Sequence, residues 1–315
     1  MSSVAALAEG VVRGDVRAMA RAISRVEDGH PDAAALIAAL FPRAGRSLVI
    51  GVTGPPGAGK STLVDRLAAH YRKVGKSVGI VAVDPTSPYT GGAILGDRIR
   101  MQAHATDPGV FIRSMATRGH LGGLAAATAH VLTILAAAGR ELILVETVGV
   151  GQDEVDIVSL ADVSLVMLVP GLGDEVQALK AGIMEIADVF VVNKADREGV
   201  DRVIAEIQSM LSMASHEARR PEIVKTVAQS GEGTAELVRA IDAFRAEAER
   251  AGLLAGKRRA QLALQFREAL QRRLLERVHE QALPPAERER VVDRLAARET
   301  DPWSAADEVL KRMGI

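Results

Sequence analysis

The central part of the chain alternates between short apolar runs and longer amphipathic segments. Five short runs are rich in β-branched residues and show no polar alternation: 47–52, 77–83, 141–146, 163–169 and 188–193. Continuous runs of this kind predict strands that are buried on both faces, as in a parallel sheet covered by helices. The segments near 61–74, 121–138, 174–187, 199–214 and 234–250 predict the helices that separate or follow these strands. The pattern therefore predicts an α/β fold with a doubly wound, mostly parallel sheet and a ligand site at the carboxyl edge of the strands.

The two ends of the chain have helical periodicity and no strand pattern. Residues 1–44 predict two or three short helices. After Gly252, apolar residues recur every four positions from Leu262 to Val278, and Pro284–Pro285 interrupts this run. We therefore expect an N-terminal helical extension over 1–44, a central domain over 45–252 and a C-terminal helical arm over 253–315. The arm is either a dimerisation element or a helical segment that packs on its own domain, and both interpretations stay open.

Composition excludes several classes of function. The 315 residues include 39 Lys plus Arg, 40 Asp plus Glu and no Cys. Without Cys there is no disulfide framework, thiol nucleophile or cysteine-ligated metal site. The formal net charge of −1 argues against a general nucleic-acid binder. The sequence has no secretory signal pattern and no apolar stretch of membrane-spanning length, so we expect a cytoplasmic protein without membrane partners.

A glycine-rich motif follows the first predicted strand. Gly54-Pro-Pro-Gly-Ala-Gly-Lys-Ser61 matches the phosphate-loop pattern G-x-x-x-x-G-K-[ST] and precedes a predicted helix. Glycines let backbone N–H groups surround phosphate oxygens, and the helix N-terminus adds positive potential. Lys60 is expected to reach the β and γ phosphates, and Ser61 to ligate Mg²⁺. The predicted phosphate loop consists of Gly54, Pro55, Pro56, Gly57, Ala58, Gly59, Lys60 and Ser61.

A second motif indicates which base is bound. Asn193-Lys194-Ala195-Asp196 ends a buried run with N-K-x-D. A carboxylate at Asp196 can accept hydrogen bonds from N1–H and the exocyclic amine of guanine, a donor pair that adenine lacks. Asn193 is expected to tie this loop to the phosphate loop, and the stem of Lys194 to cover the base. A further base-contacting loop is predicted at Val227, Ala228 and Gln229.

Acidic residues after other strands are candidates for holding Mg²⁺ or the attacking water. Glu146-Thr-Val-Gly149 stands where small GTPases have D-x-x-G, whose glycine N–H senses the γ-phosphate. Asp84 and Asp97 are the further candidates, although an Asp after a strand is equally often a helix cap. A second glycine-containing loop carries Asp174, Glu175 and Lys180, and a helix cap explains its acids equally well.

These motifs, in this order, resemble the MeaB/ArgK family of GTPases. The resemblance covers roughly residues 5–260 and rests on GVTGPPGAGKSTLVDRL, VDPTSPYTGGAILGDRIRM, VETVGVGQDEVDI, GDEVQALKAGI and VVNKAD. It implies a GTP- and Mg²⁺-dependent hydrolase that assists an adenosylcobalamin-dependent acyl-CoA mutase, typically methylmalonyl-CoA mutase. The assistance would consist of gating cofactor delivery from an adenosyltransferase and of protecting or reactivating the mutase.

The resemblance also assigns residues and an assembly. It extends the phosphate loop to Thr62 and places Asp84, Asp97 and Glu146 among the Mg²⁺ and switch acids. It places 174–180 in a switch that faces the mutase, and it implies a homodimer formed through the C-terminal helices. The family's G-Q-S-E is Gly151-Gln152-Asp153-Glu154 in this chain, so an additional charge follows the switch residue Gln152.

Two alternatives belong to other functional classes. A nickel-insertion metallochaperone has similar nucleotide chemistry, but it needs Cys or clustered His, and the sequence has no metal-ligand spacing among its seven His residues. A kinase linked to basic amino-acid transport is an older assignment within this family. Release of phosphate to water, as opposed to its transfer to an acceptor, separates a GTPase from a kinase.

Overall fold

The structure is a computed structural model, and it describes residues 3–45, 47–84, 104, 106–116, 123–147, 158–171, 186–213 and 220–314. The described residues form a seven-stranded sheet in the order β3-β2-β4-β1-β5-β6-β7, in which every neighbouring pair is parallel. This confirms the predicted α/β class. The strands are β1 (Leu48–Thr53), β2 (Val78–Asp84), β3 (Val110–Ala116), β4 (Leu142–Glu146), β5 (Val163–Leu168), β6 (Val189–Asn193) and β7 (Glu222–Thr226).

The two edge strands, β3 and β7, are the ones that the apolar runs do not predict. β7 alternates between exposed and buried positions, and only Val224 and Thr226 are buried in it. The five inner strands coincide with the predicted runs to within one residue. An edge strand has one neighbour and less cover, so it does not require a continuous apolar run.

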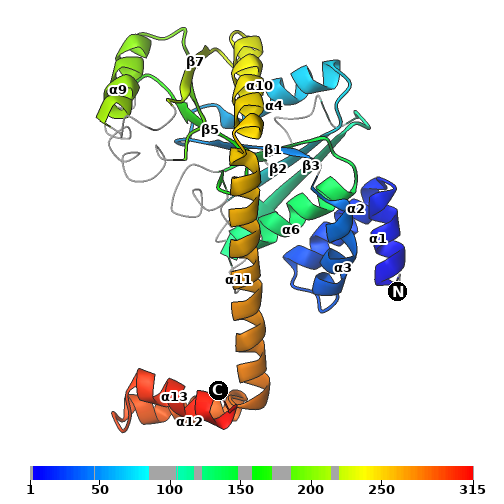
Figure 1. Cartoon of the computed structure of the whole chain (residues 1–315), viewed down its shortest axis with the longest axis vertical. Coiled ribbons are helices and arrows are strands. Elements are labelled where there is room, and N and C mark those ends of the chain that lie inside the picture. Colours follow the sequence, from blue (N-terminus) through cyan, green and yellow to red (C-terminus); the bar gives the residue numbers. More distant parts are fainter. Residues whose placement is uncertain are drawn as a thin grey trace. The chain divides into compact units, whose positions relative to one another are not determined.

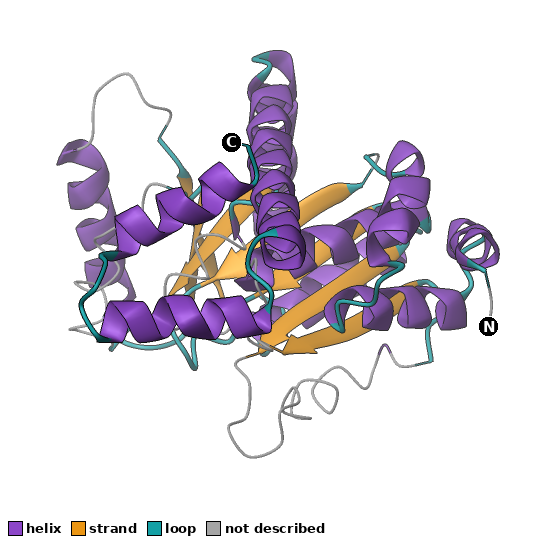
Figure 2. Ribbon diagram, turned by 90° about the horizontal axis from the view of Figure 1, so that it is seen from below, coloured by secondary structure: helices purple, strands orange, loops and turns teal. Residues whose placement is uncertain are grey.

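Helices cover both faces of the sheet (Figures 1 and 2). On one face, α4 (Lys60–Lys73) and α10 (Thr234–Arg250) share an apolar core with β1, β5 and β6. On the other face, α6 (Gly123–Ala137) packs on β2, β3 and β4. A smaller cluster joins α9 (Val200–Met213) to β5 and β6. The predicted helix at 174–187 lies mostly outside the described residues.

The N-terminal helices belong to the same core as α6. They are α1 (Val4–Val12), α2 (Val16–Glu27), α3 (Ala33–Leu40) and the 3-10 turn η1 (Phe41–Arg43). Leu7, Met19, Ile23 and Leu36 are fully buried in this cluster together with Ile134 of α6. The amphipathic pattern that predicts helices in 1–44 thus corresponds to a face that packs on α6.

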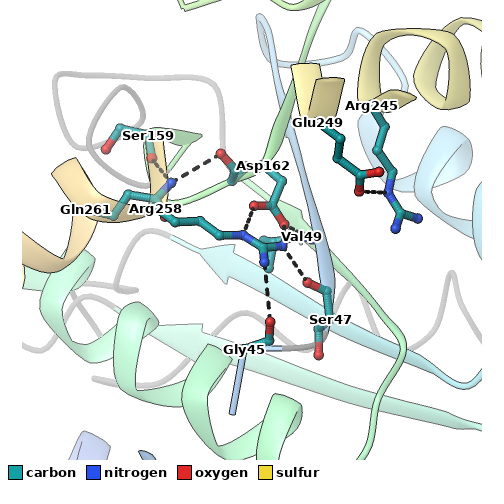
Figure 3. Close-up of polar contacts among 10 residues, drawn as sticks. Gly45, Ser47, Val49, Ser159, Asp162, Arg245, Glu249, Arg258 and Gln261 are labelled. Carbon is teal, nitrogen blue, oxygen red and sulfur yellow. Dashed lines mark hydrogen bonds and ion pairs between the residues drawn. The ribbon is translucent and has the colours of Figure 1, made fainter. Parts of the chain in front are cut away.

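The chain divides into two compact units, residues 1–261 and 262–315. The long helix α11 (Leu253–Gln281) begins in the first unit. There Arg258 forms a two-point ion pair with Asp162, which precedes β5, and donates to the backbone carbonyls of Gly45 and Ser47 before β1 (Figure 3). One turn further along, Gln261 donates to the carbonyls of Ser159 and Ala161. Long-range polar contacts therefore hold the start of α11 at the amino ends of β1 and β5.

The second unit contains the rest of α11, α12 (Pro285–Ala296) and α13 (Pro302–Arg312). The last two helices form an antiparallel hairpin (Figure 2) that is held by ion pairs from Arg294 to Glu308 and from Arg312 to Glu287. The predicted break at Pro284–Pro285 lies at the start of α12, where proline suits the first helical position. Within the described residues, no helix is both long and apolar enough to span a membrane.

Candidate functional site

The predicted phosphate loop connects β1 to α4 at the carboxyl edge of the sheet. Gly54 has a φ of +142°, and a Cβ there would lie 2.4 Å from the carbonyl oxygen of Met167 on β5. Gly59 has a φ of +93°, and its Cβ would lie 2.6 Å from Nδ2 of Asn193. Both positions therefore require glycine, for conformation and for space. Between them, Pro56 and Gly57 are exposed, whereas Ala58 is buried.

Lys60 is folded back into this loop. Its Nζ donates to the carbonyls of Gly54 over 2.7 Å and Pro55 over 3.0 Å, and the residue is buried. Lys60 is also the first residue of α4, whose free N–H groups and dipole make that end of the helix electropositive. A buried cation, a helix N-terminus and turns of glycine backbone together form a site that suits a polyphosphate. Thr62, the last predicted residue of this segment, is exposed on the first turn.

Ser61, in the first turn of α4, contacts Glu146 at the end of β4. The Oγ of Ser61 donates to Oε1 of Glu146 over 2.5 Å, and both residues are buried. A hydroxyl and a carboxylate oxygen are ligands that Mg²⁺ prefers, so this donor set fits the ion. A second hydrogen bond joins the same two segments. Oγ1 of Thr147, the residue after Glu146, donates to Oγ1 of Thr53, the residue before the phosphate loop, over 3.0 Å. The end of β4 is therefore linked to both ends of the phosphate loop.

Asn193 connects the phosphate loop to the predicted base-binding segments. Its Nδ2 donates to the carbonyl of Ala58 over 2.7 Å. Its Oδ1 accepts from the backbone N–H of Ala228 over 3.0 Å and from the hydroxyl of Thr226 over 3.1 Å. The Asn193 side chain is buried. One amide thus joins three segments that are far apart in the sequence.

The residues after Asn193 turn outward. Lys194 has a φ of +56°, uncommon for a residue other than glycine, and its Nζ donates to the carbonyl of Gly57 over 2.7 Å. Asp196 is exposed on the following turn. The structure therefore brings the N-K-x-D segment next to the phosphate loop and leaves the Asp196 carboxylate accessible to a ligand.

The third predicted loop is held by an arginine that the motifs do not single out. Arg66, on α4, donates through Nε to the carbonyl of Ala228 over 3.0 Å and through Nη2 to that of Gln229 over 2.6 Å. Val227 pairs with Glu232 across the turn that follows. Arg66 and Ala228 are 162 positions apart in the sequence, so no local pattern predicts their contact. The only sequence signal for Arg66 was its position in the quoted segment GVTGPPGAGKSTLVDRL.

Other predicted residues are placed only in part. Asp84 ends β2, and Ala82 lies opposite Glu146 in the register, so the backbone of Asp84 is at the same sheet edge as Glu146. The structure describes nothing of the Asp84 side chain. Six predicted residues lie outside the described residues: Asp97, Gly149, Gln152, Asp174, Glu175 and Lys180. In the part of the chain that is described, no group of three or more His, Asp or Glu side chains is arranged to hold a metal ion.

Comparisons with known proteins agree with this geometry. The sequence model of the family described as "Methylmalonyl Co-A mutase-associated GTPase MeaB" matches residues 19–282. A putative GTPase of Pyrococcus abyssi is 49% identical over 311 residues, which cover 98% of this chain and 96% of that protein. The mitochondrial methylmalonic aciduria type A homolog of Mus musculus is 33% identical over 96% of this chain and 77% of its own length.

A solved structure is similar over nearly its full length. It is described as a LAO/AO transport system kinase, and it aligns with a TM-score of 0.69 and 25% sequence identity, covering 99% of this chain and 98% of that one. The GTPase ArgK of Escherichia coli is 37% identical over 83% of this chain and 82% of its own length. The match to the family model extends from the second helix to the end of α11.

Proposed function

The chain belongs to the MeaB family of methylmalonyl-CoA mutase-associated GTPases, and we propose that its GTPase cycle serves as a chaperone for an adenosylcobalamin-dependent acyl-CoA mutase. GTP would bind at the carboxyl edge of the sheet with Mg²⁺ and be hydrolysed to GDP and phosphate. The observation that supports the nucleotide assignment is the set of hydrogen bonds made by the Asn193 side chain. The Asn193 side chain bonds Ala58 in the G-x-x-x-x-G-K-[ST] segment and Ala228 in the loop after β7, which supports a common binding site for these segments and N-K-x-D.

The phosphate end of the site would act by positioning and charge. Backbone N–H groups of 54–59 and the N-terminus of α4 would hold the phosphate oxygens, and Lys60 would exchange its carbonyl partners for the β and γ phosphates. Phosphoryl transfer develops charge on these oxygens, and a fixed buried cation stabilises that charge without reorganisation. Ser61 and Glu146 would hold Mg²⁺ beside the phosphates, where the ion would supply further positive charge.

Ser61 and Glu146 are the residues that would hold the ion. They already lie in contact, so the ligands need little movement to bind it, either directly or, for Glu146, through water. Asp84 and Asp97 remain proposals as further ligands or as residues that orient the attacking water. Gly149 remains a proposal as the backbone sensor of the γ-phosphate.

The base end of the site would select guanine. The exposed carboxylate of Asp196 would accept two hydrogen bonds from the guanine edge, and the Lys194 stem, which crosses toward Gly57, would cover the ring. Val227, Ala228 and Gln229 would close the pocket. Adenine offers no matching pair of donors, so selectivity follows from hydrogen-bond chemistry.

The link to a mutase rests on family membership. The names of the family and of the mouse relative refer to methylmalonyl-CoA mutase and to methylmalonic aciduria. Gln152, Asp174, Glu175 and Lys180 are the residues we propose for switching and partner contact. A homodimer through the C-terminal arm and contact with an adenosyltransferase belong to the same proposal.

The test is hydrolysis of GTP by the full chain, alone and with purified adenosylcobalamin-dependent mutases. No arginine finger is evident in the phosphate-loop motifs, so we expect slow intrinsic turnover that rises when the cognate mutase is added. Turnover that stays unchanged across methylmalonyl-CoA, isobutyryl-CoA and related mutases contradicts the chaperone role.

A kinase is the second candidate, because the similar solved structure is described as a transport system kinase. GTP that carries a label on its γ-phosphate distinguishes a GTPase from a kinase. Release as free phosphate supports the GTPase, and transfer to protein or to arginine supports the kinase.

A further inference from the structure

Arg66 lies five residues after the G-x-x-x-x-G-K-[ST] motif, which ends at Ser61, and it joins two parts of the candidate site. It stands on α4, the helix that begins with the phosphate-loop residue Lys60. Its guanidinium contacts the segment at 227–229, which follows β7 at the other end of the domain sequence. We propose that Arg66 is a positioning residue for guanine recognition, which fixes the third base-binding loop onto the phosphate-loop helix.

The geometry of the contact is that of a clamp. Nε and Nη2 of one guanidinium donate to two consecutive carbonyls, at 3.0 Å to Ala228 and 2.6 Å to Gln229. The planar guanidinium presents these donors in a fixed fork, so both peptide groups are held in one orientation. Hydrogen bonds from a charged donor are shorter and stronger than neutral ones. Lysine has a single point charge on a flexible stem and does not reproduce this arrangement.

The same loop is held from its opposite side. The N–H of Ala228 donates to Oδ1 of Asn193, whose Nδ2 donates to the phosphate-loop carbonyl of Ala58. Ala228 itself is buried, whereas Gln229 is exposed. With the N–H of Ala228 held by Asn193 and its carbonyl by Arg66, the loop is fixed in two directions.

The consequence for recognition is specific. A base-contacting loop binds a base more tightly when its polar groups are already fixed before the base arrives. Without Arg66 the carbonyls of Ala228 and Gln229 are no longer held, so ordering the loop on binding costs conformational entropy and lowers the affinity for the base. Lys60 donates to the carbonyls of Gly54 and Pro55, and Ser61 donates to Glu146, so phosphate binding and chemistry use other contacts and are expected to persist. This inference rests on the proposed nucleotide site and deepens it.

The experiment compares binding of GTP with binding of inorganic tripolyphosphate, which has the phosphates and no base. For Arg66→Met we expect the dissociation constant for GTP to rise about tenfold, equivalent to about 1.4 kcal/mol. The constant for tripolyphosphate is expected to stay within about twofold. KM for GTP should rise in parallel while kcat at saturating GTP stays within about twofold, since the bound state still carries the same catalytic groups.

Two further variants make the result decisive. Arg66→Lys keeps the charge and loses the fork, so its affinity for GTP is expected to lie between those of the wild type and Arg66→Met; it also serves if the methionine variant does not fold. Arg239→Met, on α10, removes an exposed arginine that pairs with Glu236, and it is expected to bind GTP as the wild type does.

Equal losses for GTP and tripolyphosphate, a fall in kcat without a rise in KM, or unchanged affinity for GTP in both Arg66 variants would each overturn the inference. These outcomes differ from a failure of the proposed function. If wild-type protein binds no guanine nucleotide, the site assignment itself is wrong. If the wild type binds GTP and the Arg66 variants bind it equally well, only the role of Arg66 is wrong.

Discussion

Ser61 on α4 donates a hydrogen bond to Glu146 at the end of β4, with 2.5 Å between the two oxygens. The contact joins the first turn of the phosphate-loop helix to the neighbouring strand. We propose that these two side chains hold Mg²⁺ when a nucleotide is bound, because a hydroxyl and a carboxylate oxygen are ligands that this ion prefers.

Ser61→Ala is expected to weaken the binding of Mg²⁺, so that hydrolysis requires a higher Mg²⁺ concentration. Interactions with a charged partner contribute about 1.5–3 kcal/mol. The Mg²⁺ concentration for half-maximal GTP hydrolysis should therefore rise about tenfold or more, measured by phosphate release across a Mg²⁺ titration. Ser212→Ala, an exposed serine on α9, is the control. Identical titrations for the two variants would show that Ser61 is not a ligand.

Gly59→Ala is expected to break the connection between the phosphate loop and Asn193. The new Cβ would lie 2.6 Å from Nδ2 of Asn193, and the φ of +93° adds backbone strain of about 1–2 kcal/mol. Gly75→Ala is a matched control, because Gly75 has a φ of +82° and nothing within 4 Å of a Cβ. We expect GTP affinity to fall at least about tenfold in Gly59→Ala only, by isothermal calorimetry. Similar losses in both variants would assign the effect to strain alone.

Asp196→Asn is expected to change the base that the site selects. The amide replaces an acceptor oxygen with a donor, which no longer matches the N1–H and exocyclic amine of guanine and instead suits the second carbonyl of xanthine. Competition binding should show weaker affinity for GTP and a gain for xanthosine triphosphate. Unchanged affinity for GTP would remove Asp196 from the base site.

Arg258→Met is expected to destabilise the first unit. Asp162 has a side chain that is 4% exposed, so loss of its partner leaves a buried carboxylate, with Val49 N–H as a remaining donor. Removing one partner of a buried pair costs about 3–5 kcal/mol. The Arg258 side chain is 42% exposed, and solvent screening reduces the expected loss to about 2 kcal/mol in the free energy of unfolding, measured in urea.

Arg259→Met provides the control for that measurement. Arg259 is the next residue on α11 and is exposed. Its replacement is expected to change the free energy of unfolding by less than about 0.5 kcal/mol. A comparable loss in both variants would show that the ion pair with Asp162 is not the cause.

Asp107→Asn is expected to make the free energy of unfolding depend less on pH in the acid range. A two-point hydrogen bond from Arg72, and one from the backbone N–H of Gly109, hold the pKa of Asp107 below its usual value. A carboxyl whose folded pKa is lowered stabilises the protein above its unfolded pKa of about 3.9 and loses that contribution as pH falls toward the folded value. Urea unfolding of wild type and variant should therefore differ at pH 7 and converge below about pH 4. A constant difference would contradict this origin.

The inner strands were predictable because burial on both faces forces a continuous apolar run, which a window of six residues reveals. β3 and β7 were not, because an edge strand has one neighbouring strand and less cover, so it does not require a continuous apolar run. In the same way, the phosphate loop and N-K-x-D were evident because each needs its residues adjacent in the chain. Arg66 and Thr147 were not, because each meets its partner only after the strands are ordered.

The sequence by itself thus determined the class of the fold, the order of its inner elements and the two motifs on which the nucleotide assignment rests. Their information is local, because an apolar run, a glycine-rich turn and the start of a helix are each defined by residues that are adjacent in the chain. The tertiary structure alone decided that Asn193 joins three loops, that Arg66 holds the third one, and that Arg258 places the start of α11 against Asp162. Those contacts link residues 35 to 162 positions apart. They depend on which strands lie side by side in the folded sheet, a relation that periodicity along the chain does not record.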